Sequence, residues 1–85
     1  MAGLSFSDEY AAMLVLLRAA RKAAGLTQAD VARAFGRTQG AISKMEAGEI
    51  RIDPIELQRF AELYGVEVTA LLPPRGGAPQ GEPGE

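Results

Sequence analysis

The sequence lacks cysteine and histidine entirely, and these two absences restrict the chemistry open to the chain. Without cysteine it can form no disulfide framework and no thiolate metal site. The absence of both residue types removes most zinc chemistry, thiol catalysis and imidazole acid–base catalysis. The sequence therefore implies no coenzyme and no metal ion, and we expect a protein that is not an enzyme.

Long apolar runs are missing as well. The longest, Ala11–Leu17, contains seven residues, whereas a helix needs ~20 to span a bilayer. Asp8 and Glu9 lie near the N-terminus, where a signal peptide would carry positive charge. We therefore expect no membrane span and no export signal, which favours a cytoplasmic protein.

Length and composition favour one small globular domain followed by a tail. The chain has 85 residues, of which 47% are apolar and 24% charged, and a domain of this size buries only about 60% of the surface of its unfolded chain. The last thirteen residues, Pro73–Glu85, hold four of the five prolines and four of the ten glycines. Because so little apolar surface cannot offset the entropy of ordering, we predict a domain over residues 1–72 and a disordered tail over residues 73–85.

The net charge of −2 is unevenly distributed along the chain. Between Arg18 and Arg51, seven basic and three acidic residues give a local charge of +4, and the two basic and eight acidic residues elsewhere give −6. Such asymmetry can locate a polyanion-binding surface even in a chain that is negative overall. A solvated basic surface without a ligand is the alternative that charge alone leaves open.

The first 72 residues have the pattern of a compact all-α bundle of five short helices. No segment alternates apolar and polar residues long enough to form a strand, because the one candidate, Val66–Val68, is too short. We predict helices from Ser7 to about Ala24, from Thr27 to Gly36, from Thr38 to Gly48, from Asp53 to Gly65, and over Glu67–Leu72.

Capping residues predict where these helices begin and end. Ser7 is the expected N-cap of the first helix. Thr27 and Asp30 have the spacing of a capping box, and Asp53 followed by Pro54 suits an N-cap and the first helical position. A glycine follows each of the first four helices, as expected for a left-handed C-terminal cap.

The first predicted helix has two apolar sides. A core stripe comprises Phe6, Tyr10, Met13, Leu14, Leu17, Ala20 and Ala24. Arg21 lies on the same stripe, so its charge needs a partner. A second apolar strip comprises Ala12, Val15, Leu16, Ala19 and Ala23. Alanine is present in many helices simply as a good helix former, but Val15 and Leu16 favour a contact with another protein.

The second and third predicted helices have the spacing of a helix-turn-helix around Gly36. Ala32 lies four residues earlier, where a small side chain lets the two helices approach closely. On the third helix Ile42 and Met45 should face inward. The residues that should then face outward are Gln39, Gly40, Ser43 and Lys44. Glutamine can pair with adenine, and lysine can reach guanine or a phosphate. A helical hairpin used only for packing would have the same outline.

These segments resemble the helix-turn-helix domains of the Cro and phage-repressor type, often called XRE-like. The resemblance extends from about Leu17 to Leu72, roughly two thirds of the chain. It is carried by RKAAGLTQADVA at 21–32, by Gly36, by TQGAISKMEAG at 38–48 and by FAELYGV at 60–66. It implies an all-α, compact, five-helix lambda-repressor-like DNA-binding domain with the helix-turn-helix at helices 2 and 3.

The resemblance also assigns roles to individual residues. It implies a structural ion pair between Arg21 and Glu46, which agrees with the position of Arg21 on the core stripe. Base-facing positions correspond to Gln39, Gly40 and Lys44, with Ser43 close by. The set of DNA-binding residues is completed, at backbone-facing positions and around the turn, by Gln28, Arg37, Thr38 and Arg51.

Several positions depart from the family pattern. Gly40 has no side chain. This indicates either that fewer base edges are contacted directly or that the backbone approaches a thymine methyl group closely. Arg37 replaces a small or apolar residue, and we expect it to point outward to a phosphate. Ile50 and Ile52 are apolar in a loop that is usually basic, where they suit either a dimer interface or a cover for the end of the fourth helix.

The resemblance implies a sequence-specific transcriptional regulator, most simply a repressor, that binds double-stranded DNA as a homodimer and associates with the nucleoid when bound. The alternative is an antitoxin-like module that binds a partner protein and also regulates its own operon. Candidate dimer surfaces are the first helix and the C-terminal edge with Ile55, Leu63, Val68 and Leu72. An enzyme is the weakest hypothesis, because the neighbouring carboxylates Asp53 and Glu56 are better explained by helix capping at Asp53.

Overall fold

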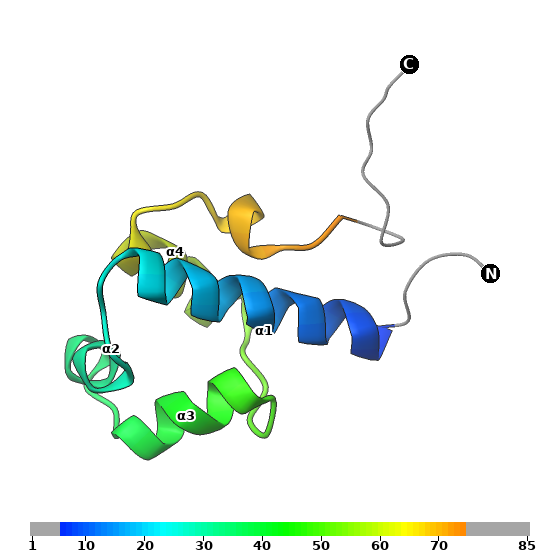
Figure 1. The fold of residues 1–85 in the computed structure, drawn as a ribbon. Helices are drawn as coiled ribbons and strands as arrows, with labels where there is room; N and C mark the ends of the chain where they lie inside the picture. Colours follow the sequence, from blue (N-terminus) through cyan, green and yellow to red (C-terminus); the bar gives the residue numbers. More distant parts are fainter. Residues whose placement is uncertain (1–5, 75–85) are drawn as a thin grey trace.

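The computed structural model describes residues 6–74, and this part of the chain is helical without any strand. It contains α1 (Phe6–Ala23), α2 (Gln28–Phe35), α3 (Gln39–Ala47), α4 (Pro54–Tyr64) and the 3₁₀ helix η1 (Val68–Leu71). In Figure 1, α1 crosses the middle of the molecule, with α3 on one side and η1 on the other. The all-α class is as predicted, but the fifth helix is only a single four-residue 3₁₀ turn.

The predicted capping residues of α2, α3 and α4 are confirmed. Thr27 and Asp30 form a full capping box, because each side chain accepts the backbone N–H of the other residue. Thr38 accepts the N–H of Ala41 at 3.1 Å at the start of α3. Asp53 caps α4 ahead of the proline at its first position. Local sequence alone therefore predicts the boundaries of these three helices.

The boundaries of α1 differ from the prediction. The chain is already helical at Phe6, so Ser7 lies inside α1 and the assignment of Ser7 as the N-cap was wrong. At the other end, Ala24 follows the last helical residue and is exposed, because Gly25 turns the chain there with a φ of +75°. Ala24 is consequently not part of the core stripe. The segment 75–85 of the predicted tail lies outside the described residues.

The core lies where α1, α3, α4 and η1 meet. Leu17, Ile42, Phe60 and Leu71 come from these four elements and are completely buried. The Phe60 ring lies 4.8 Å from the Phe35 ring, measured between centroids, which links α2 to the same core. The burial of one large apolar side chain stabilises the folded state by about 1.5–3 kcal/mol. This packing, rather than helix propensity, holds such short helices in place.

A tight turn joins α2 and α3. Gly36 has a φ of +66°, a left-handed conformation that other residues rarely adopt. The N–H of Arg37 donates to the carbonyl oxygen of Ala32 at 2.9 Å, and the Ala32 side chain is buried. The small side chain of Ala32 and the left-handed glycine together allow a short turn between closely packed helices, as the sequence predicts.

Candidate nucleic-acid interface

α3 has one buried and one exposed side. Ile42, Met45 and Glu46 are buried. The residues that we call the outer face of α3 are all exposed: Gln39, Gly40, Ser43 and Lys44. The arrangement agrees with the pattern predicted from the sequence, so polar side chains and one bare backbone position are available on a helix whose other side is fixed in the core.

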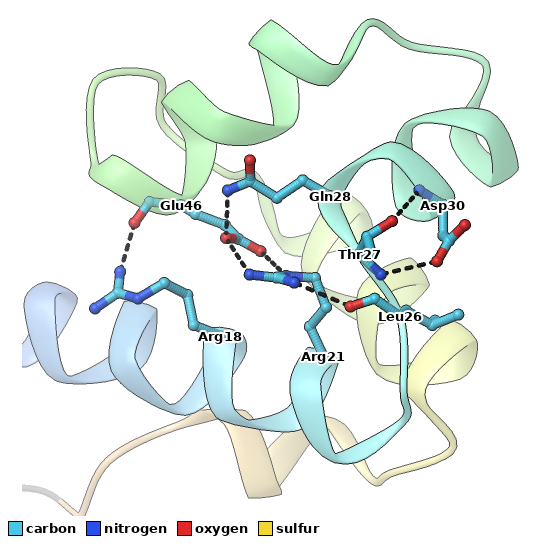
Figure 2. A network of polar contacts seen from close by, with 7 residues as sticks. All are labelled: Arg18, Arg21, Leu26, Thr27, Gln28, Asp30 and Glu46. Atoms are coloured by element: carbon cyan, nitrogen blue, oxygen red, sulfur yellow. Dashed lines mark hydrogen bonds and ion pairs between the residues drawn. The ribbon is translucent and has the colours of Figure 1, made fainter.

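A buried ion pair joins the end of α1 to the end of α3. The Nε of Arg21 donates to Oε2 of Glu46 at 2.8 Å and its Nη2 donates to Oε1 at 3.2 Å, so that the contact is bidentate (Figure 2). The third nitrogen, Nη1, donates to the carbonyl oxygen of Leu26 at 2.9 Å. All three nitrogens of the guanidinium are therefore used, which is what a buried arginine requires.

Two further side chains contact Glu46. Gln28, at the start of α2, donates from Nε2 to Oε1 of Glu46 at 2.9 Å. Arg18 donates from Nη1 to the backbone carbonyl oxygen of Glu46 at 2.7 Å, in the last turn of α3 (Figure 2). The orientation of α3 thus depends on α1 and α2 together. The role of Arg18 was not predicted from the sequence, although its position one helical turn before Arg21 indicates the same side of α1.

The turn before α3 is fastened to the start of α4. Nη2 of Arg37 lies 2.7 Å from Oε2 of Glu56. The other carboxylate oxygen of Glu56 accepts the backbone N–H of Asp53 at 2.9 Å and completes the capping box of α4. Arg37 therefore has a protein partner that the sequence did not indicate, while its side chain stays partly exposed. The spacing of Asp53 and Glu56 is that of a capping box, and this signal could have identified the role of Glu56.

The loop after α3 is supported by α1. The guanidinium carbon of Arg51 lies 4.2 Å from the centroid of the Tyr10 ring. The backbone N–H of Ile52 donates to the hydroxyl oxygen of Tyr10 at 3.0 Å. Ile52 packs against the core, whereas Ile50 is exposed. From the sequence Tyr10 was predicted only as part of the core stripe, because no local pattern connects residues this far apart in the chain.

Elsewhere on the described surface a few large apolar side chains are exposed. Val15 of the second apolar strip is 55% exposed. At the C-terminal edge Ile55 is 60% exposed and Leu72 45%, whereas Leu63 and Val68 pack against the core. A shallow groove of about 520 Å³ lies between α4 and η1, lined by Ile52, Asp53, Pro54, Leu57, Gln58, Val68 and Leu72.

Two features are absent from residues 6–74. No group of three or more acidic, histidine or cysteine side chains is arranged to hold a metal ion in this part of the chain. None of its helices combines the length and the apolar character needed to cross a membrane.

The short turn at Gly36, the buried support of α3 and its exposed outer face define a helix-turn-helix protein. Residues 12–72 match the family described as helix-turn-helix domain. The chain belongs to this family and is of the XRE-like type. A helix-turn-helix places its second helix in the major groove of DNA, so the class is that of DNA-binding regulators.

Two solved structures are similar to the chain. An XRE-family like protein from Pseudomonas syringae pv. tomato str. DC3000 is 43% identical, with a TM-score of 0.71 over 76% of this chain and 79% of that chain. The structure of Fe(II) HppE in complex with its substrate is 26% identical, with a TM-score of 0.72 over 87% of this chain. The present chain corresponds to only 46% of the HppE chain. No curated protein matches the sequence.

Proposed function

We propose that the protein is a sequence-specific transcriptional repressor that binds DNA as a homodimer. The observation that carries the proposal is the outer face of α3, which is exposed while the rest of the helix is held by the core and by the contacts of Glu46. A rigid helix with an exposed polar side can enter the major groove without reorganising. Two copies of α3 in a dimer would lie about 34 Å apart and contact two half-sites.

In this proposal the outer face of α3 reads the bases. Gln39 offers the carboxamide that pairs with adenine, and Lys44 reaches guanine or a neighbouring phosphate. Ser43 can donate to or accept from either type of base edge. At Gly40 the backbone itself approaches the DNA, next to a thymine methyl group.

The residues around α3 are proposed to bind phosphates. Gln28 uses Nε2 on Glu46, but a carboxamide nitrogen has two hydrogens and keeps one for a phosphate. Thr38 accepts a backbone N–H as an N-cap, and its hydroxyl proton can still be donated. Arg37 has further N–H donors besides the one directed at Glu56. Arg51, in the loop that follows α3, supplies a positive charge for a further phosphate.

Selection from a library of random duplexes, followed by binding measurements across a salt series, tests the proposal. We expect a palindromic site whose half-site spacing matches a dimer, with log K falling by about 0.9 per phosphate contact for each unit of log salt. Gln39→Ala and Lys44→Ala should change the preferred bases and leave the oligomeric state unchanged. Lys22→Ala is the matched control, because it removes an exposed charge of α1. A folded, monodisperse protein that enriches no site would contradict the proposal.

The second candidate function is an antitoxin-like module that binds a partner protein. The exposure of Val15 on the second apolar strip favours it, because a half-exposed valine on a helix is available for an apolar contact. Val15→Asp should then abolish capture of a partner protein from an extract of the native cells, while the circular dichroism spectrum stays unchanged. If that variant keeps every partner and also keeps DNA binding, only the regulator function remains.

We propose no catalytic role for the two carboxylates that the sequence brings together. Asp53 and Glu56 accept each other's backbone N–H groups at 2.8 and 2.9 Å. Glu56 in addition carries the ion pair with Arg37. Helix capping and this ion pair fully account for the two residues, which supports a binding protein over an enzyme.

A further inference from the structure

Tyr10 makes two separate contacts with the loop that follows α3. Its hydroxyl oxygen accepts the N–H of Ile52 at 3.0 Å, which fixes the backbone of the loop. Its ring lies under the guanidinium group of Arg51, with 4.2 Å between the guanidinium carbon and the ring centroid. Tyr10 belongs to α1 and is partly buried against the core. One side chain thus connects a rigid helix to both the backbone and the charge of an exposed loop.

The contact leaves the N–H donors of Arg51 free. A cation–π contact acts on the charge of the guanidinium group, and no hydrogen bond to a described residue uses any of the five N–H donors of Arg51. The other arginines in contact spend donors on protein oxygens: Arg21 on Glu46 and Leu26, Arg33 on Asp30, and Arg37 on Glu56. Arg18 likewise donates to a carbonyl oxygen. Among the described arginines with such contacts, Arg51 alone is held without giving up a donor.

We propose that Tyr10 is a positioning residue that presents Arg51 to a phosphate of the bound DNA. The proposal rests on the proposed function, since it assumes that the loop after α3 faces a DNA backbone. A loop arginine that is free to rotate loses conformational entropy when it binds a phosphate. Stacking on Tyr10 removes part of that loss in advance and keeps the bidentate edge of the guanidinium available.

The test compares full-length variants for binding to a labelled duplex of random sequence, by fluorescence anisotropy across a salt series. Arg51→Ala should weaken binding and reduce the salt slope by about 0.9 for each subunit. Tyr10→Leu should weaken binding about two- to fivefold for each subunit, the range supported by an exposed cation–π contact. Tyr10→Phe keeps the aromatic ring and should therefore retain most of the DNA affinity that Tyr10→Leu loses. Lys22→Ala serves as the matched control for the removal of one exposed charge.

The double variant separates positioning from general destabilisation. If Tyr10 acts through Arg51, Tyr10→Leu should have little effect on binding once Arg51 is alanine. The δ protons of Arg51 should also show an upfield ring-current shift in the NMR spectrum of the free protein, and lose it in Tyr10→Leu. Equal weakening by Tyr10→Leu in both backgrounds, or no ring-current shift, overturns the proposal while DNA binding stands. A wild-type protein that binds no duplex overturns the proposed function and this inference with it.

Discussion

A polar kind of surface and an apolar kind of surface contrast sharply in this molecule. The outer face of α3 is polar, and side chains of α1, α2 and α4 fix the helix that carries it and the adjoining turn. The second apolar strip of α1 and the groove between α4 and η1 expose apolar side chains, including Val15 in the strip and Leu72 in the groove. The first surface is organised for directional contacts that need exact geometry, whereas the second offers contact area.

The largest effect is expected from removing the buried support under α3. Glu46→Ala leaves Arg21 buried without its carboxylate, and such a loss destabilises a fold by about 3–5 kcal/mol. Urea unfolding measures the change. Arg33→Ala removes an exposed ion pair with Asp30 as the control and should change the free energy of unfolding by less than about 1 kcal/mol. Similar values for both variants would contradict the distinction between the two ion pairs.

A smaller effect, of opposite sign, is expected on the outer face of α3 itself. A Cβ at Gly40 would meet only Thr38 Oγ1, at an ordinary distance of 3.9 Å, and glycine within a helix is less stable than alanine by about 0.5–1 kcal/mol. Gly40→Ala should therefore raise the unfolding free energy by that amount. It should also weaken DNA binding if the backbone approaches a base. Calorimetry and anisotropy measure the two effects, and unchanged affinity would exclude a close approach at this position.

The contact between the turn and α4 should contribute about 0.5–1 kcal/mol. The Arg37–Glu56 pair is only partly exposed, and ion pairs in such positions have modest effects because water screens them. We expect Arg37→Met to lower the unfolding free energy by this amount and to broaden the amide resonances of the turn at Gly36. Arg59→Met removes a charge from the exposed side of α4 as the control. Equal effects of the two variants would show that the pair does not hold the turn.

The smallest effect near neutral pH is expected at Tyr64. Its hydroxyl is buried without a hydrogen-bond partner among the described residues, so Tyr64→Phe should be neutral or stabilise by up to about 1 kcal/mol. Burial, aided by the carboxylate of Glu46, raises the pKa of the phenol above its ordinary value of 10.0, and Arg21 opposes the shift. The folded state therefore holds this proton more tightly than the unfolded state.

Stability should consequently decline as the pH rises above about 10, where the phenol ionises in the unfolded chain first. Tyr64→Phe lacks this group and should lose less stability over the same range. Thermal unfolding of both proteins between pH 8 and about 11 measures the difference. Parallel curves would show that Tyr64 ionises as easily in the fold as in the unfolded chain.

Much of the fold and part of the candidate site follow from local sequence. Thr27, Thr38 and Asp53 predict the starts of three helices, because a capping side chain contacts N–H groups only two or three residues away. The exposed outer face of α3 follows from helical periodicity in the same way. Ser7 was assigned wrongly because two other residues near the N-terminus, Ser5 and Asp8, satisfy the same local rule for an N-cap.

The partners of the charged residues required the tertiary structure. Periodicity places Arg21 on a core-facing side, but contacts such as Arg18 to the carbonyl of Glu46 and Arg51 to Tyr10 join residues 28 and 41 positions apart in the chain. Arg37 was expected to point outward to a phosphate, and only the tertiary structure shows that α4 brings a carboxylate to it through Glu56.

The sequence by itself determined the four α-helices, the N-caps of α2, α3 and α4 and the helix-turn-helix spacing, since these depend on interactions within a few residues. Only the tertiary structure decided which guanidinium groups are buried, paired or stacked with their donors free. These contacts depend on where separate helices are brought together by burial of a shared apolar core. The residues that orient α3 are therefore a consequence of packing, whereas those exposed on its outer face are already apparent in the order of the amino acids.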